Sequence, residues 1–133
     1  MALGPGWWAV VGIRSVSPVV YASRGYEGAL LEQFVYAVRR RLARNRVASR
    51  IVIPDDLDVP ALDIAEHPGR RDEVRLRQIG SAWVASEESV PVLVPSFVAQ
   101  PWGWNVVINP SHPGFDRVVV AETVDVLWDP LVI

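Results

Sequence analysis

The sequence predicts an α+β domain in which two main helices accompany a mixed, largely antiparallel sheet. Residues 26–44 and 72–86 repeat apolar side chains at helical spacing, and five or six short runs rich in β-branched residues lie around them. Most connections between these runs are shorter than the roughly dozen residues that a parallel crossover needs. No Gly-x-Gly-x-x-Gly follows a strand, so a Rossmann dinucleotide site is not indicated.

Composition limits the function classes. The chain has 133 residues, of which 50% are hydrophobic and 21% charged, as expected for one folded domain over residues 1–133. A net charge of −2 implies no general attraction to nucleic acid or to an anionic membrane. The absence of cysteine excludes disulfides and thiolate chemistry, and the two histidines lack metal-ligand spacing, so no metal site is expected. No apolar run is long enough to span a membrane and no signal peptide is recognisable, which predicts a cytoplasmic protein.

The first third of the chain is expected to form two strands and a helix. Residues 7–11 favour a short buried strand that ends at Gly12, and residues 18–23 favour a second strand. Ser23 is a candidate N-cap for the helix that follows. Glu32 interrupts the apolar stripe of this helix, and it is either solvated at the edge or held inside by a polar partner, because a buried unpaired carboxylate is costly. The stripe comprises Ala29, Leu30, Leu31, Phe34, Val35, Val38 and Leu42.

The middle of the chain adds a strand, a turn and the second helix. Residues 49–54 alternate like a strand. Residues 54–58 contain three aspartates after a proline, which is typical of a turn and only weakly suggestive of a cation site. Residues 66–72 are a polar loop, and Asp72 is a plausible cap for the helix over residues 72–86.

The last third is expected to be strands. Residues 90–98 carry two prolines, which cannot donate to a ladder, so this run is an edge strand or an interrupted one. Residues 105–109 favour a strand, and residues 117–121 and 124–128 favour two more, joined as a hairpin around Glu122-Thr123.

Four short segments, in this order, resemble the RES domain family: Val-Val-Tyr21-Ala-Ser, Ala-Leu-Leu-Glu32, Val94-Pro-Ser96, and Ile108-Asn-Pro110 with His112-Pro. Known members of that family are toxins of bacterial toxin–antitoxin pairs that consume NAD, and their fold is like that of the ADP-ribosyltransferases. The resemblance therefore implies an enzyme with NAD as substrate and a cognate antitoxin protein as partner. It leaves open whether the chain forms a homo-oligomer.

The resemblance also implies roles for three side chains. Glu32 is the candidate catalytic carboxylate, Tyr21 the candidate aromatic wall, and Ser96 a hydroxyl for the substrate or for Glu32. From the residues alone, each has a structural alternative, which for Glu32 is favoured: a solvent-facing helix glutamate, a core tyrosine and a strand serine. The motif around Asn109 and His112 is expected first as turn structure, whereas Trp102 and Trp104 could form a pocket wall or a partner contact.

The front of the chain departs from the family pattern. RES proteins usually carry one arginine near their start and a second in a Gly-Gly-Arg-Trp-Asn-like segment before the tyrosine strand. Here Trp7 stands where that arginine is expected and Ala9 where the asparagine is. Arg14 is the nearest substitute for binding the diphosphate, and Arg24 is a second one. Without such a guanidinium we expect weak NAD binding, because charge-assisted hydrogen bonds contribute about 1.5–3 kcal/mol each.

Three functions follow from this resemblance. The first is cleavage of NAD at the nicotinamide–ribose bond by water or phosphate. The second is a catalytically inactive RES domain that still binds its antitoxin. The third is an ADP-ribosyltransferase that modifies a protein target with the same site.

Overall fold

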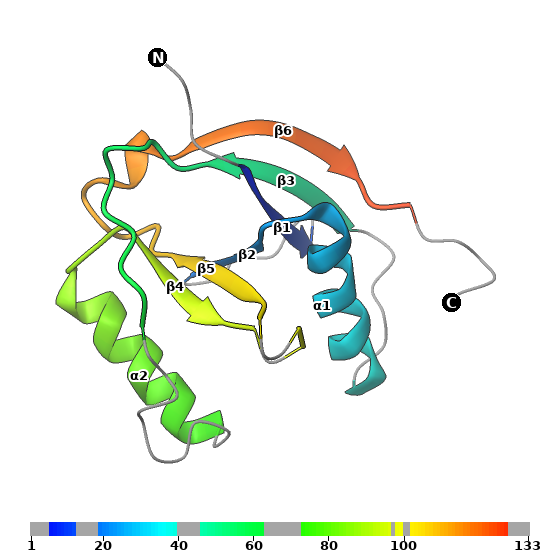
Figure 1. Cartoon of the computed structure of the whole chain (residues 1–133), viewed down its shortest axis with the longest axis horizontal. Helices are drawn as coiled ribbons and strands as arrows, with labels where there is room; N and C mark the ends of the chain where they lie inside the picture. The colour runs from blue at the N-terminus through cyan, green and yellow to red at the C-terminus, as the bar shows by residue number, and fades with distance from the viewer. Residues whose placement is uncertain are drawn as a thin grey trace.

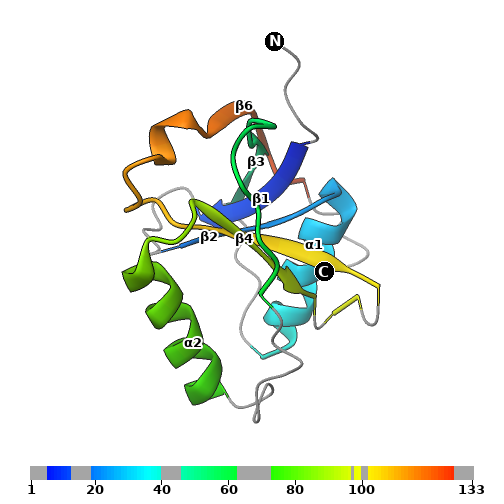
Figure 2. The same cartoon turned by 60° about the vertical axis from the view of Figure 1, so that its left-hand side comes forward.

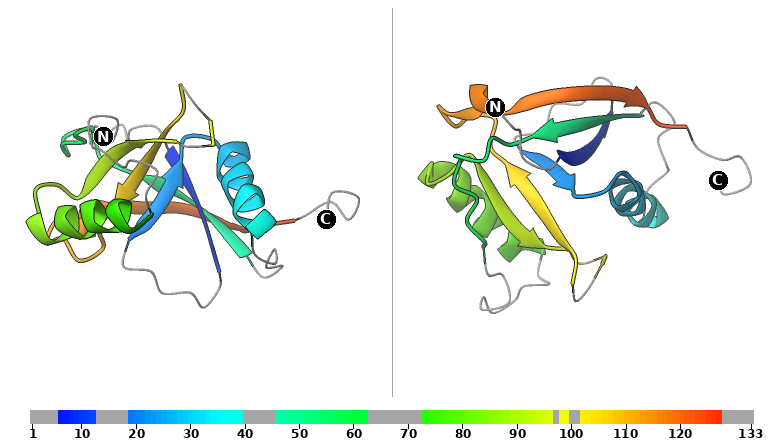
Figure 3. Two further views of the ribbon diagram at one scale, coloured as in Figure 1. Left: turned by 90° about the horizontal axis from the view of Figure 1, so that it is seen from below. Right: turned by 45° about the horizontal axis from the view of Figure 1, so that its top comes forward.

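The backbone forms one six-stranded sheet in the strand order β4-β5-β2-β1-β3-β6, and every pairing between its strands is antiparallel. The computed structural model describes residues 6–12, 19–39, 46–62, 73–96, 98–99 and 102–127. The strands are β1 (Gly6–Gly12), β2 (Val20–Ser23), β3 (Arg46–Val52), β4 (Pro91–Pro95), β5 (Trp104–Ile108) and β6 (Val119–Asp125). The direction of the strands turns strongly between β4 and β6 (Figure 3).

Both long helices pack on the same face of this sheet. Helix α1 (Tyr26–Arg39) places Ala29 against Val10 and Ala48, and α2 (Glu73–Ser86) places Trp83 against Val92 and Val94. Strands β4 and β5 lie between the two helices (Figure 1), and α2 and β6 lie on opposite sides of the molecule in both views (Figures 1 and 2). The centre of this face therefore lies between the two helices.

The register brings polar residues to that centre. Ser23 pairs with Trp8 on one side and with Asn105 on the other, and Asn105 pairs with Val94. Residues opposite each other in a ladder share a face, as do residues two apart along a strand. Tyr21, Ser23 and Asn105 thus lie together on the face that carries the helices.

The opposite face carries the main apolar core. Alternate residues of β1, β2 and β5 are buried there, among them Trp7, Ala9 and Ala22. The segments that follow β3 and β5 cover this face with partly buried side chains: Leu57, Val59, Phe115 and Val118. A packed apolar layer thus lies beneath the polar centre, on the other side of the sheet.

The predicted fold class is confirmed, and two local predictions are wrong. The hairpin expected at Glu122-Thr123 does not form, because residues 119–125 make one continuous strand paired along β3. Ser23 does not cap α1; it lies in β2, and its hydroxyl donates to Asn105. Within the apolar stripe of α1, Ala29 is buried, whereas Leu31 and Phe34 are 47% and 39% exposed.

Other predictions stand as made. The proline-containing strand β4 is at the sheet edge, and the amide of Leu57 donates to the carbonyl of Pro54 in the predicted aspartate turn. The expected end of the first helix near Arg44, the loop at 66–72 and the cap at Asp72 lie outside the described residues. No described helix is both long and apolar enough to cross a membrane.

Candidate functional site

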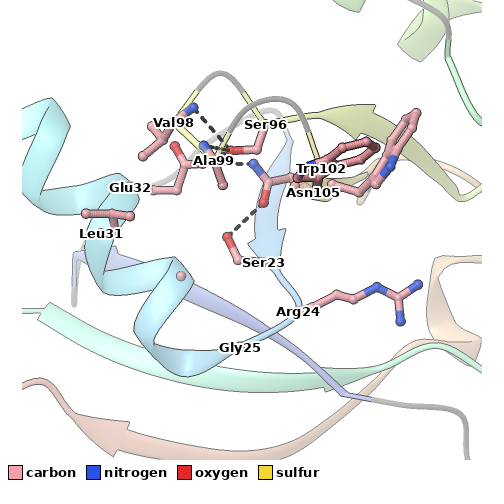
Figure 4. Close-up of a pocket in the computed structure, with 13 residues that line it drawn as sticks. Ser23, Arg24, Gly25, Leu31, Glu32, Ser96, Val98, Ala99, Trp102 and Asn105 are labelled. Atoms are coloured by element: carbon pink, nitrogen blue, oxygen red, sulfur yellow. Dashed lines mark hydrogen bonds between the residues drawn. The ribbon is translucent and has the colours of Figure 1, made fainter.

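Glu32 projects from the second turn of α1 and is held by two donors from the sheet side. Both the Ser96 hydroxyl and the Asn105 side-chain amide donate to its Oε1 atom, each at 2.9 Å. Figure 4 shows the carboxylate of Glu32 facing these two residues. Of the two alternatives for Glu32, the structure shows the one with polar partners.

Asn105 is a site residue that the sequence interpretation missed. It is 2% exposed, and its amide also donates to the Tyr21 hydroxyl at 3.0 Å while its carbonyl oxygen accepts from the Ser23 hydroxyl at 2.9 Å. Only its position gave a signal: it is the one polar residue within the otherwise apolar strand β5. The structure thus brings together Glu32, Tyr21 and Ser96 through Asn105.

Ser96 is fixed by the loop that follows β4. Its oxygen accepts from the backbone amides of Val98 and Ala99 at 3.2 and 3.0 Å, while its own hydroxyl hydrogen is given to Glu32. The amide of Ser96 in turn donates to the carbonyl of Gly103 at 2.9 Å. Because the oxygen already accepts two bonds and the hydrogen is used, Ser96 is placed as a support for the carboxylate and not as a nucleophile.

Tyr21 has its ring and hydroxyl in different surroundings. The residue is 43% exposed, but its hydroxyl lies inside the polar cluster. Burial of that hydroxyl raises the pKa of Tyr21; the Asn105 hydrogen bond opposes this shift and the nearby Glu32 charge reinforces it. The phenol is therefore neutral at physiological pH. Its ring lines a neighbouring apolar cavity of about 210 Å³ between α2 and β4.

A cavity of about 260 Å³ opens beside Glu32, and its lining includes Ser23, Ser96 and Asn105. Trp102 and Trp104 form part of its wall and are 87% and 43% exposed. Tyr21 is not part of this lining, so it reaches the cluster from the adjacent cavity. The prediction that Glu32, Tyr21 and Ser96 face one cleft is therefore wrong: Glu32 and Ser96 line the first cavity, Tyr21 lines the second, and the Tyr21–Asn105 hydrogen bond connects them.

Arg24 is the cationic residue in the described lining of the cavity beside Glu32. Its guanidinium carbon lies 4.8 Å from the centre of the Trp7 ring, in a cation–π arrangement. Trp7 itself is 5% exposed and belongs to the core on the opposite face. The tryptophan found where an arginine was expected therefore supports a different arginine. Arg14, the first substitute named above, lies outside the described residues.

The remaining candidates are structural. The Asn109 amide donates to the carbonyl of Val84, and a ring nitrogen of His112 lies 2.9 Å from the carbonyl of Glu87, so both hold turns against the end of α2. In the aspartate turn, Asp56 pairs with Arg117 at 2.6 Å. Among the described residues, no three His, Asp or Glu side chains gather as a metal site.

Comparison with known proteins identifies the family of the chain. The model of the RES domain family matches residues 13–129 of the chain. The chain belongs to the RES domain family. A Sphingobium sp. (strain YBL2) protein named "Prs ADP-ribosylating toxin" is 30% identical over 138 residues, which cover 96% of this chain and 80% of that protein.

The fold of this RES domain also matches a solved structure. A chain in the crystal structure of the M. tuberculosis MbcT–MbcA toxin–antitoxin complex superposes with a TM-score of 0.63, covering 91% of this chain and 83% of that one. Sequence identity over that match is 14%, so it shows the shared fold. The predicted family and the predicted ADP-ribosyltransferase-like fold are confirmed.

Proposed function

We propose that this RES domain is a toxin that transfers ADP-ribose from NAD and releases nicotinamide. The observation that carries the proposal is the Glu32 carboxylate, which Ser96 and Asn105 hold at the wall of a cavity. A preorganised carboxylate in a partly enclosed site is suited to stabilise positive charge that develops in a transition state. The named activity of the Sphingobium relative supports the same reaction class.

The chemistry needs one carboxylate. The nicotinamide of NAD is cationic on its ring nitrogen, so it leaves as a neutral molecule and needs no general acid. Charge instead grows on the ribose carbon, as in the oxocarbenium-like transition states of glycosidases. Glu32 stabilises that charge and accepts a hydrogen bond from a ribose hydroxyl, while the neutral Tyr21 contributes its hydroxyl to the polar cluster from the neighbouring cavity.

Arg24 is proposed as the partner of the NAD diphosphate. Arg24 belongs to the lining of the cavity beside Glu32, its guanidinium extends away from Glu32 toward Trp7 (Figure 4), and no carboxylate among the described residues pairs with it. A guanidinium binds phosphate oxygens through paired N–H groups, and stacking on Trp7 holds it without neutralising its charge. On this proposal the impairment expected from the front of the chain is offset by Arg24.

The acceptor of the ADP-ribose distinguishes two versions of this function. Water or phosphate as acceptor makes the domain an NAD glycohydrolase or phosphorylase. A protein acceptor makes it an ADP-ribosyltransferase, which the name of the Sphingobium relative favours, with Prs as the first target to try. The alternative to both versions is a domain that has no enzymatic activity and only binds an antitoxin.

The test is nicotinamide release from NAD, measured with and without Prs, together with transfer of labelled ADP-ribose to protein. The wild-type chain should release nicotinamide, and Glu32→Gln should abolish release while keeping the thermal unfolding temperature. Glu27→Gln, on the exposed first turn of the same helix, is the matched control and should stay active. Label on Prs identifies transfer to protein, and equal turnover by Glu32→Gln would refute the role of the carboxylate.

Binding is tested separately by calorimetric titration with NAD. Arg24→Ala should weaken NAD affinity by roughly 10- to 100-fold, as expected for loss of one charge-assisted contact of about 1.5–3 kcal/mol. Arg75→Ala on α2 is the control, because this exposed arginine lies on the lining of another surface hollow. Unchanged affinity in Arg24→Ala would assign the diphosphate to another residue.

A further inference from the structure

Asn105 uses all of its hydrogen-bonding groups on site residues. One amide hydrogen goes to Glu32 Oε1, the other to the Tyr21 hydroxyl, and the carbonyl oxygen accepts from Ser23. The residue is buried in β5, between β2 and β4, so the sheet fixes its backbone on both sides. An asparagine with this arrangement has one orientation available to it.

The orientation follows from the chemistry of its neighbours. An ionised carboxylate only accepts hydrogen bonds, so the NH₂ group must face Glu32 and the carbonyl oxygen must face Ser23. The same NH₂ group then donates to the Tyr21 oxygen. As a consequence, the phenol hydrogen points away from Asn105 and is available to another acceptor.

This arrangement also distinguishes the two oxygens of the Glu32 carboxylate. Ser96 and Asn105 both donate to Oε1, and no described residue bonds to Oε2. Glu32 has three rotatable side-chain bonds, so without these donors its carboxylate would sample several positions. With Oε1 held on two sides, Oε2 is the oxygen that remains for a ligand.

We propose that Asn105 is a positioning residue for ADP-ribose transfer, which presents Oε2 of Glu32 to the ribose and makes the Tyr21 hydroxyl a hydrogen-bond donor. The inference rests on the proposed function for its catalytic part, and on the hydrogen bonds alone for its structural part. One buried amide thus aligns two groups from different elements, a helix carboxylate and a strand phenol. A displacement of about 1 Å in such a group can cost on the order of 100-fold in rate.

The decisive variants are Asn105→Asp and Asn105→Ser. The aspartate is isosteric, but when ionised it cannot donate to Glu32 and repels it; a pair of close carboxylates takes up one proton at a raised pKa. At neutral pH nicotinamide release should fall by about 10- to 100-fold, mainly in kcat. On acidification the shared proton restores a donor, so the activity of Asn105→Asp should rise relative to wild type. Asn105→Ser cannot titrate, and its loss should persist at every pH.

The matched control is Asn109→Asp. Asn109 is 1% exposed and lies just past the other end of β5, and its amide bonds to a helix carbonyl and not to the site. The same substitution there should change the unfolding temperature without any gain in activity on acidification. The proposal is overturned if activity recovers on acidification in both Asn105→Asp and Asn109→Asp, or in neither of them. Failure of both Asn105 variants to fold would assign Asn105 to structure alone and overturn it as well.

A second measurement does not depend on activity. Tyrosine ionisation is followed by ultraviolet absorbance in the wild type and in Asn105→Asp, with Tyr21→Phe identifying the contribution of Tyr21. Replacing a donor by an anion should move the titration of Tyr21 to higher pH. If the wild type releases no nicotinamide with or without a protein acceptor, the proposed function fails, and this titration still decides the hydrogen-bond arrangement. An unchanged titration would overturn that part.

Discussion

At the scale of the residue, Tyr21 shows how the site changes an ordinary side chain. Its hydroxyl is desolvated among Asn105 and Glu32, although the residue as a whole is 43% exposed. Desolvation disfavours the phenolate, so the pKa in the folded chain is raised above the unfolded value. A group with a raised pKa adds stability that is fully present below the unfolded pKa and is lost as pH rises through the folded pKa.

This predicts a pH-dependent difference between the wild type and Tyr21→Phe. Below the ordinary tyrosine pKa of 10.0 the difference between their unfolding temperatures should be constant. Above it, the unfolded wild type ionises Tyr21 while the folded state resists, so the wild type should lose stability relative to Tyr21→Phe. Thermal unfolding from pH 8 to pH 11 measures this, and parallel curves over that range would contradict it.

At the scale of the element, the connection from β4 to β5 holds Ser96 through very close backbone packing. The amide of Gly103 donates to the carbonyl of Ala99 at 2.7 Å, and the carbonyl of Gly103 accepts from the amide of Ser96. A Cβ atom at position 103 would lie 2.5 Å from the Cβ of Ala99 and 2.8 Å from its carbonyl oxygen. Only glycine fits there without moving the loop that places Ser96.

Gly103→Ala should therefore lower both the unfolding temperature and nicotinamide release. Gly80→Ala is the matched control, because a Cβ in the middle of α2 meets no atom within 4 Å. Alanine is favoured over glycine in a helix by about 1 kcal/mol, so this variant should be more stable than the wild type and equally active. Thermal melts and the release assay on the two variants give the comparison. If Gly103→Ala changed neither the unfolding temperature nor nicotinamide release, the loop would be able to relax around the added Cβ.

Strand β1 gives a second test at this scale. Replacing Trp7 by arginine would match the family pattern, yet Trp7 is 5% exposed and lies in the core. Losing a buried tryptophan costs about 3–5 kcal/mol, and an unpaired buried charge adds to that. We expect Trp7→Arg to unfold or melt far below the wild type and not to restore NAD binding. Trp102→Arg, at an 87% exposed position, should melt near the wild type; a well-folded Trp7→Arg with tighter NAD affinity would contradict this account.

Prediction from sequence succeeded where the signal was local. Runs of β-branched residues located the strands, and prolines placed β4 at an edge, because both effects act within a few residues. The hairpin near Glu122 failed because pairing with β3 kept residues 119–125 extended, which is a tertiary effect. The cluster of Glu32 with Tyr21 and Ser96 was predicted from the family resemblance. Glu32 and Ser96 are 64 positions apart in the sequence, and residue spacing alone predicts no contact between them. Asn105 was missed because its role exists only in the register between β2 and β5.

At the scale of the whole molecule, the site lies where two helices leave the face of one sheet uncovered, and apolar side chains surround it. Leu31 and Trp102 line the cavity, and Phe34 follows Leu31 by three positions on the exposed side of α1. Exposed apolar side chains around a cavity are typical of a surface that binds another protein. An NAD-consuming enzyme also harms its own cell unless something covers the site. We call Leu31, Phe34 and Trp102 the rim of the cavity. A protein partner that covers this rim would bury the exposed apolar side chains and would also block the site.

We therefore predict that the product of a neighbouring gene forms a stable complex with this chain and stops nicotinamide release by covering the cavity beside Glu32. Phe34→Asp should weaken the complex and leave the activity of the isolated chain unchanged, because Phe34 belongs to the rim and not to the cavity lining. Val120→Asp is the control, since Val120 is 60% exposed on the distant strand β6 and should bind the partner normally. Co-purification and the release assay, each with and without the partner, measure both effects. A stoichiometric complex that still consumes NAD at the full rate would place the partner elsewhere, because a covered cavity cannot admit a dinucleotide.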